Sequence, residues 1–139
     1  MEESDNRAPQ RIKNNFFRFK QFVVHQSLSG MKVTTEACLL GAKVPVENCK
    51  HILDIGSGTG LLSLMMAQRT QACITGVEID EKAYQQSVEN SKKSPFYSQI
   101  VFLNQSIQRF SETQMALLQR QYFDLIVSNP PFFTNHLQT

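Results

Sequence analysis

From residue 50 onward, short runs of apolar and β-branched residues alternate with longer stretches in which apolar residues have helical spacing. The short runs predict strands at 51–55, 72–79, 100–103 and 123–127. The longer stretches predict helices at 59–69, 81–93 and 111–119, the last with Ser111 as its N-cap. Strands that alternate with helices form parallel sheets with right-handed crossovers. We therefore expect an α/β fold: an open, doubly wound, mostly parallel sheet with helices on both faces.

The segment before residue 50 has a different pattern. Phe16 to Val24 is rich in aromatic and β-branched residues, which predicts a strand. Gln26 to Gly30 would form a turn, and Met31 to Val33 would be the partner strand. The sequence therefore predicts a β-hairpin ahead of the sheet.

A short helix is expected after this hairpin. The hydroxyl of Thr34 or Thr35 can cap its start, and Pro45 stops it. The polar residues before the hairpin suggest a mobile basic arm. The expected organisation is therefore an arm at 1–15, a hairpin and helix at 16–49, and the sheet-forming part at 50–139.

Composition limits the class of protein. With 139 residues, 41% of them hydrophobic, the chain can form one domain with a core that needs no disulfide or structural metal. Its three cysteines are odd in number and widely spaced, which predicts reduced thiols and no metal site. The longest apolar stretch, Leu61 to Ala67, is far too short to span a bilayer, and the polar start lacks a signal-peptide pattern. We expect a cytoplasmic protein that does not enter a membrane.

Positive charge is concentrated at the front of the chain. Between Asn6 and Thr35 there is no acid, while six basic residues alternate with four phenylalanines. Such a mixture suits a phosphate backbone and unstacked bases, although an amphipathic strand with its charges in water would look the same. The candidate RNA-binding residues are Arg18, Lys20 and Lys32.

A glycine-rich motif, D-I-G-S-G-T-G at 54–60, joins the first strand of the predicted sheet to its first helix. Glycines let the chain turn sharply and let a ligand touch the backbone. A dinucleotide site would need glycine at position 61, which is Leu61. Glu78, at the end of the next strand, can accept hydrogen bonds from both hydroxyls of a ribose. The pair indicates a nucleoside site, and a glycine-rich turn that binds nothing is the alternative.

These residues resemble the first two motifs of the Rossmann-like S-adenosylmethionine-dependent methyltransferases. The resemblance implies S-adenosyl-L-methionine as cofactor, with the glycine loop against its amino-acid end and Asp54 positioning that loop and, directly or through water, the ammonium. It further implies that Glu78 holds the ribose and that Ser106 and Ile107 flank the adenine, although many members have Asp in place of Ser106. The cofactor-binding candidates are Thr35, Glu36, Asp54, Gly56, Ser57, Gly58, Gly60, Glu78, Ile79, Ser106, Ile107 and Asn129.

The tetrad Asn129-Pro130-Pro131-Phe132 follows the fourth predicted strand, at the same sheet edge as the glycine loop. It resembles the N-P-P-[FY] motif of methyltransferases that modify an exocyclic or amide nitrogen. The Asn129 side-chain oxygen and the Pro130 carbonyl would accept the two N–H protons, Pro131 would stiffen the loop, and Phe132 would stack on the base. These four residues are the catalytic candidates, and the chemistry requires no metal.

Two further motifs, F-K-Q-F at 19–22 and M-K-V-T-T-E-A-C-L-L-G at 31–41, narrow the resemblance. They are similar to those of the bacterial tRNA(Val) adenine-N6 methyltransferases, which act on the adenosine just 3′ of the anticodon. The similarity runs from about Phe16 to Phe133 and implies a tRNA substrate. It also implies that Thr35 and Glu36 line the cofactor pocket, with Thr-Glu where the family has Thr-Asp.

Methyltransferases of this class have further strands after the N-P-P-F motif, so we expect the 139-residue chain to be incomplete, with its C-terminal strands missing. The strand at 123–127 would then be a sheet edge that could pair with another copy. Such a chain should bind cofactor but turn over poorly or aggregate. Two other functions stay open: a ribosomal-RNA guanine-N2 or protein-glutamine methyltransferase, and a non-catalytic nucleotide- or RNA-binding module.

Overall fold

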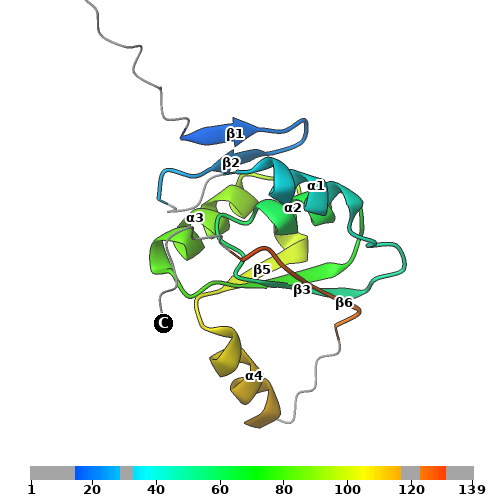
Figure 1. The fold of residues 1–139 in the computed structure, drawn as a ribbon, viewed down its shortest axis with the longest axis vertical. Coiled ribbons are helices and arrows are strands. Elements are labelled where there is room, and N and C mark those ends of the chain that lie inside the picture. Colours follow the sequence, from blue (N-terminus) through cyan, green and yellow to red (C-terminus); the bar gives the residue numbers. More distant parts are fainter. Residues whose placement is uncertain (1–14, 29–32, 117–122, 131–139) are drawn as a thin grey trace, which may run out of the picture.

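The computed structural model describes residues 15–28, 33–116 and 123–130. Its centre is a four-stranded sheet whose paired neighbours are all parallel, in the order β5-β4-β3-β6 (Figure 1). The strands are β3 (His51–Ile55), β4 (Cys73–Val77), β5 (Ile100–Leu103) and β6 (Leu125–Ser128). The chain moves outward from β3 to β5 and then returns to the other side of β3. This reversal is the topological switch of a doubly wound sheet, where ligands bind beyond the strands' carboxyl ends.

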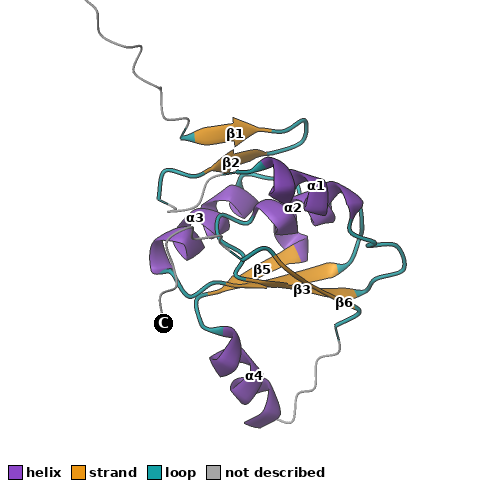
Figure 2. Cartoon of the chain, viewed as in Figure 1, coloured by secondary structure: helices purple, strands orange, loops and turns teal. Residues whose placement is uncertain are grey.

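Helices cover both faces of this sheet, as the sequence predicts (Figure 2). The helices are α1 (Thr35–Lys43), α2 (Leu61–Ala67), α3 (Glu81–Lys92) and α4 (Ile107–Ala116), with a 3₁₀ turn, η1, at Tyr97–Gln99. Helices α1 to α3 lie on one face and α4 lies on the other (Figure 1).

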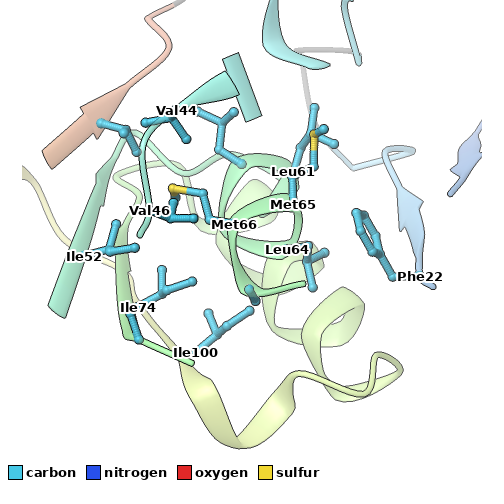
Figure 3. Close-up of a cluster of buried hydrophobic side chains, with 14 of the residues drawn as sticks. Phe22, Val44, Val46, Ile52, Leu61, Leu64, Met65, Met66, Ile74 and Ile100 are labelled. Carbon is cyan, nitrogen blue, oxygen red and sulfur yellow. The ribbon is translucent and has the colours of Figure 1, made fainter. Parts of the chain in front are cut away.

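Two hydrophobic clusters hold these layers together. The larger cluster packs α2 against the sheet, and Leu64 and Met66 of α2 are fully buried near Ile52 and Ile74 (Figure 3). The smaller cluster joins Phe110 of α4 to the opposite face of the sheet. Because every residue of α2 is buried, this short helix is fully enclosed and fixes the loop that precedes it.

The start of α4 corrects one prediction. Ser111 is not its N-cap, because the helix begins four residues earlier, at Ile107. The Ser106 hydroxyl accepts a hydrogen bond from the Arg109 amide at 3.1 Å, so Ser106 serves as the cap. Ile107 and Phe110 both pack against the sheet, which places the first turn of the helix before the predicted start.

The N-terminal hairpin also differs from its prediction. The expected single strand at 16–24 is two strands, β1 (Phe16–Arg18) and β2 (Val23–His25), which pair antiparallel with each other. The predicted turn at Gln26–Gly30 and partner at Met31–Val33 are therefore wrong. The chain reverses between Phe19 and Phe22, where the Phe19 amide donates to the Phe22 carbonyl at 2.8 Å and the two rings stack. Burial of Phe22 in the larger cluster draws the chain inward there.

Side-chain amides of α3 attach this hairpin to the domain. Asn90 accepts from the His25 amide at 2.9 Å and donates to the His25 carbonyl at 3.0 Å and to the Thr59 carbonyl at 2.9 Å. Gln86, one turn earlier, accepts from the Leu28 amide and donates to the Ser27 hydroxyl. Both amides are almost fully buried. Asn90 thus connects the hairpin to the glycine-rich loop before α2.

Two further observations concern membrane-spanning helices and the cysteines. Within the described residues, no helix has the length and apolar character needed to cross a membrane. All three cysteines are free thiols. The predicted arm lies almost entirely outside the described residues.

Candidate functional site

The loop between β3 and α2 depends on its glycines. Gly56, Gly58 and Gly60 have φ of 69°, 54° and 89°, a left-handed region that other residues adopt only with strain. At Gly60 a Cβ would also lie 2.9 Å from the ring of Phe102 in β5. The amides of Gly56 and Ser57 both donate to the Val77 carbonyl, at 2.8 and 3.0 Å. The loop is therefore folded over the carboxyl ends of β3 and β4.

Glu78 follows β4 and holds this loop from the other side. One carboxylate oxygen accepts from the Gly58 amide at 2.8 Å and the other from the Asp80 amide at 2.9 Å. The Asn104 side chain donates to the Glu78 and Ile79 carbonyls, which fixes the backbone there. Each carboxylate oxygen has a second lone pair, so Glu78 can still accept from a ligand.

Asp54 is buried at the end of β3 with only half of its carboxylate satisfied. One oxygen accepts from the Ser63 hydroxyl at 2.8 Å, while the other is buried and has no hydrogen-bond partner among the described residues. Burial, helped by the nearby negative charge of Glu78, raises the pKa of Asp54 to about 7 against the Ser63 hydrogen bond, which lowers it. The buried Ser57 hydroxyl likewise lacks a partner in the described part. Unpartnered buried polar atoms are rare, and these two suit a ligand with a cationic or hydrogen-bonding end.

Two hollows lie along this edge of the sheet, and Gly56 borders both. The first is lined by Asp54, the glycine loop and Asn129, together with Val33 and Ala37. The second contains the predicted ribose and adenine residues: Glu78, Ile79, Ser106 and Ile107. The resemblance implies that these two sets of residues hold the two ends of one extended ligand, and both sets line hollows at one edge of the sheet.

Other predicted residues fall in different places. Asn129 follows β6 and lines the first hollow, and Pro130 comes directly after it, exposed. Pro131 and Phe132 lie outside the described residues. Thr35 and Glu36 are exposed and do not line the first hollow, which instead contains Ala37 from the same helix. The helix begins at Thr35, and Thr34 is its N-cap, whose hydroxyl accepts from the Ala37 amide at 3.2 Å.

Several lining residues were not anticipated. The first hollow also includes Val33, Ala37, Thr59, Leu61 and Leu62. The signal that could have revealed the last three is their position directly after the glycines, where the loop turns into α2. Among the described residues, no group of three or more histidine, cysteine or acidic side chains is placed to hold a metal ion.

Two of the three candidate RNA-binding residues lie away from this edge. Arg18 and Lys20 are exposed on the hairpin and line a separate hollow, while Lys32 is outside the described residues.

Comparison with solved structures identifies the architecture. A SAM-dependent methyltransferase from Agrobacterium tumefaciens superposes with a TM-score of 0.64 over 90% of this chain and 42% of its own, at 17% identity. The TYW2 protein of P. horikoshii, solved in complex with MeSAdo, matches with a TM-score of 0.56 over 66% of this chain and 35% of its own, at 18% identity. The chain therefore has the Rossmann-like fold of S-adenosylmethionine-dependent methyltransferases, which confirms the predicted fold class.

Sequence comparison defines the family within that fold. The chain belongs to the methyltransferase small domain family, whose family model matches residues 25–139. Proteins named tRNA1(Val) (adenine(37)-N6)-methyltransferase are 48% identical in Dyadobacter fermentans, over 90% of this chain and 50% of that protein, and 49% identical in Haemophilus influenzae strain PittEE, over 84% and 49%. These matches confirm the resemblance stated from the motifs. The chain spans about half the length of these curated relatives.

Proposed function

We propose that this protein transfers a methyl group from S-adenosyl-L-methionine to N6 of an adenosine in tRNA, the position next to the anticodon of tRNA1(Val). The observation that carries the proposal is the convergence of Asp54, the glycine loop and Asn129 on one hollow. The relatives named for this activity are similar over nearly the whole chain. Such an activity would place the protein in the cytoplasm, where tRNA is modified.

The residues present fit the cofactor. The unpartnered Asp54 oxygen and the Ser57 hydroxyl can accept from the ammonium of the methionine end. Glu78 can accept from the ribose hydroxyls, and Ile79, Ser106 and Ile107 line the hollow where the adenine would lie. When bound, S-adenosyl-L-methionine supplies an electrophilic methyl group on a sulfonium, whose leaving group is a neutral thioether. The remaining requirement is to position the acceptor nitrogen in line with that methyl group.

Asn129 would position the acceptor nitrogen for this transfer. An adenine amino group is a poor nucleophile because its lone pair is delocalised into the ring. Hydrogen bonds from its two N–H groups to the Asn129 side-chain oxygen and the Pro130 carbonyl would favour a pyramidal nitrogen with an available lone pair. Asn129 lines the hollow that would hold the methionine end, so acceptor and donor would meet at this edge of the sheet.

The first experiment is calorimetric titration of the chain with S-adenosylhomocysteine, with NAD as control ligand. We expect binding of the former only, and its loss in Glu78→Ala. Glu81→Ala is the matched control, because Glu81 is an exposed acid in the first turn of α3 and lines neither hollow. A folded chain that binds neither ligand would overturn the cofactor assignment.

The second experiment tests the reaction. Unmodified tRNA1(Val), ribosomal RNA and a release-factor peptide are each incubated with cofactor and protein, and the product is identified by mass analysis. N6-methyladenosine from the tRNA is the expected product, whereas N2-methylguanosine or methylglutamine would move the assignment to the alternative transferases. Asn129→Ala should abolish transfer while keeping cofactor affinity.

We also propose that the 139-residue chain self-associates through β6. Among the described strands β6 has a neighbour on one side only, and Ile126 is 58% exposed. An unpaired strand edge is a template for pairing with another copy. Sedimentation at increasing concentration should show dimers that Ile126→Lys removes, and a monomer throughout would contradict this.

A further inference from the structure

A second concave surface lies at the N-terminal hairpin. None of its lining residues lines either hollow at the carboxyl ends of the strands. This hairpin hollow, about 350 Å³, is bounded by the turn of the hairpin and by the end of α3. Its lining residues are Arg18, Phe19, Lys20, Gln21, Phe22, Val23, His25 and Lys93. Two segments separated by about seventy residues thus contribute to one surface, and both contribute cations.

The charge of this hollow is one-sided. Arg18 and Lys20 on the hairpin and Lys93 at the end of α3 are exposed, and no acidic residue lines the hollow among the described residues. Glu89, one turn before Lys93, is not a lining residue. Neither Arg18 nor Lys20 nor Lys93 has an ion-pair partner in the described part of the chain. Unpaired cations gathered around a concavity favour a ligand with several negative charges along its length.

Aromatic surface accompanies these cations. Phe16 in β1 is 50% exposed, and its ring lies 6.2 Å from the ring of His25, which lines the hollow. An exposed ring beside a row of cations suits a polynucleotide, whose bases stack while its phosphates pair with Lys and Arg. A free phosphate ion would make no use of the ring.

Hydrogen bonds also connect the hairpin hollow to the first hollow, where the methionine end of the cofactor would lie. Asn90 bonds both backbone groups of His25, which lines the hairpin hollow, and the carbonyl of Thr59, which lines the first hollow. One buried side chain therefore contacts residues that line both surfaces and helps to fix their relative position. A ligand held in the hairpin hollow would be kept at a fixed place relative to the bound cofactor.

We propose that the hairpin hollow binds phosphates of the RNA substrate and so positions that RNA relative to the methyl-transfer site. The inference rests on the proposed function for the identity of the RNA, and adds to it a docking surface in which Lys93 of α3 works together with the hairpin. Lys93, His25 and Gln21 are members of this surface that the basic pattern of the N-terminal segment does not indicate.

The test is titration of the 139-residue chain into fluorescently labelled, unmodified tRNA1(Val) at salt concentrations from about 50 to 200 mM. The variant is the triple substitution Arg18→Gln, Lys20→Gln and Lys93→Gln. The control is Lys50→Gln, which removes an exposed cation at the amino end of β3, on the opposite edge of the sheet from the glycine loop. Each lost phosphate contact should reduce the slope of log K against log salt by about 1.

We expect the triple variant to bind at least about tenfold more weakly than Lys50→Gln and to show a slope smaller by about 2 to 3. Calorimetry with S-adenosylhomocysteine should give unchanged affinity, which shows that the variant is folded. Equal affinity and slope in the triple variant and Lys50→Gln would overturn the proposal. Displacement of the RNA by inorganic phosphate at matched ionic strength would also overturn it, by assigning the hollow to a small anion.

These outcomes separate the docking surface from the proposed function. RNA binding that is sensitive to the triple variant in a chain that does not bind S-adenosylhomocysteine would keep the docking surface and reject the transferase. Cofactor binding together with RNA binding that is unchanged in the triple variant would keep the transferase and reject the docking surface.

Discussion

The parallel sheet and the N-terminal hairpin differ in where along the chain their determinants lie. Strand β3, the glycine loop and α2 are consecutive, and the loop is closed by hydrogen bonds to β4, the next strand. The hairpin, in contrast, depends on Gln86 and Asn90, which lie 58 to 65 residues further along the chain. A region whose partners are close in sequence shows its structure in its own pattern, whereas the hairpin's placement depends on a helix that follows much later.

The largest expected effect is a change in the free energy of unfolding with pH, caused by Asp54 in the sheet region. Asp54 has an ordinary pKa of 3.8 that burial raises to about 7, so between these values the folded state binds more protons than the unfolded state. The free energy of unfolding should therefore fall as pH rises from about 4 to about 7, by roughly 4 kcal/mol, and level off above. Urea unfolding across this range measures it. Asp54→Asn should flatten the profile, and an unchanged profile in that variant would contradict the assignment.

The same titration affects ligand binding with the opposite sign. An ammonium next to the free Asp54 oxygen favours the ionised carboxylate, so affinity for S-adenosylhomocysteine should increase as pH rises toward about 7. The increase approaches tenfold per pH unit below that value.

The second effect breaks the link between the two regions. Asn90→Ala removes three hydrogen bonds and takes this partner from the half-buried backbone groups of His25 and the buried carbonyl of Thr59, which should lower the free energy of unfolding by about 3 kcal/mol. Gln86→Ala is the matched control, because it is equally buried on the same helix but bonds only Ser27 and Leu28. Asn90→Ala should weaken S-adenosylhomocysteine binding and Gln86→Ala should not. Equal losses of affinity in both variants would argue against a connection through Thr59.

The third effect is confined to the glycine loop. Gly60→Ala places a methyl group 2.9 Å from the Phe102 ring and also forces a positive φ, so it should cost about 2 kcal/mol or more. Gly58→Ala has the same backbone strain but no atom within 4 Å of the added methyl, and should cost about 1 kcal/mol. Thermal unfolding of the two variants provides the comparison. If the two variants are equally stable, the close approach to Phe102 does not contribute to the loss of stability.

The smallest effect concerns the helix that follows the hairpin. Thr34→Ala removes the hydroxyl that accepts from the Ala37 amide and should lower stability by about 1 kcal/mol. Thr35→Ala changes an exposed residue in the first turn and should have little effect. A larger loss from Thr35→Ala, measured by urea unfolding, would reverse the assignment of the cap.

The parallel sheet and the hairpin also differ in how far their structures can be predicted from the sequence. The four strands of the sheet agree with the pattern of consecutive strand and helix units, and this order brings Asp54, Glu78 and Asn129 to one edge. The roles of Ser106 and Ile107 beside an adenine come from the resemblance and stay a prediction. The start of α4 was missed because Ser106 and Ser111 are both suitable caps, and only the packing of Phe110 on the sheet decides between them.

The hairpin was mispredicted for a related reason. A nine-residue segment rich in aromatic and β-branched residues fits one long strand as well as two short ones. The break between Phe19 and Phe22 comes from burial of Phe22 against residues that the local pattern does not contain. Likewise, Ala37 rather than Glu36 lines the first hollow because the helix start at Thr35, capped by Thr34, determines which side chains face inward.

The attachment of the hairpin to Asn90 has a consequence for the order in which the chain is made. A ribosome adds about 5 to 20 residues per second. The 65 residues between His25 and Asn90 therefore correspond to roughly 3 to 13 s of synthesis. During that interval the hairpin has been translated but Asn90, which anchors it through both backbone groups of His25, has not.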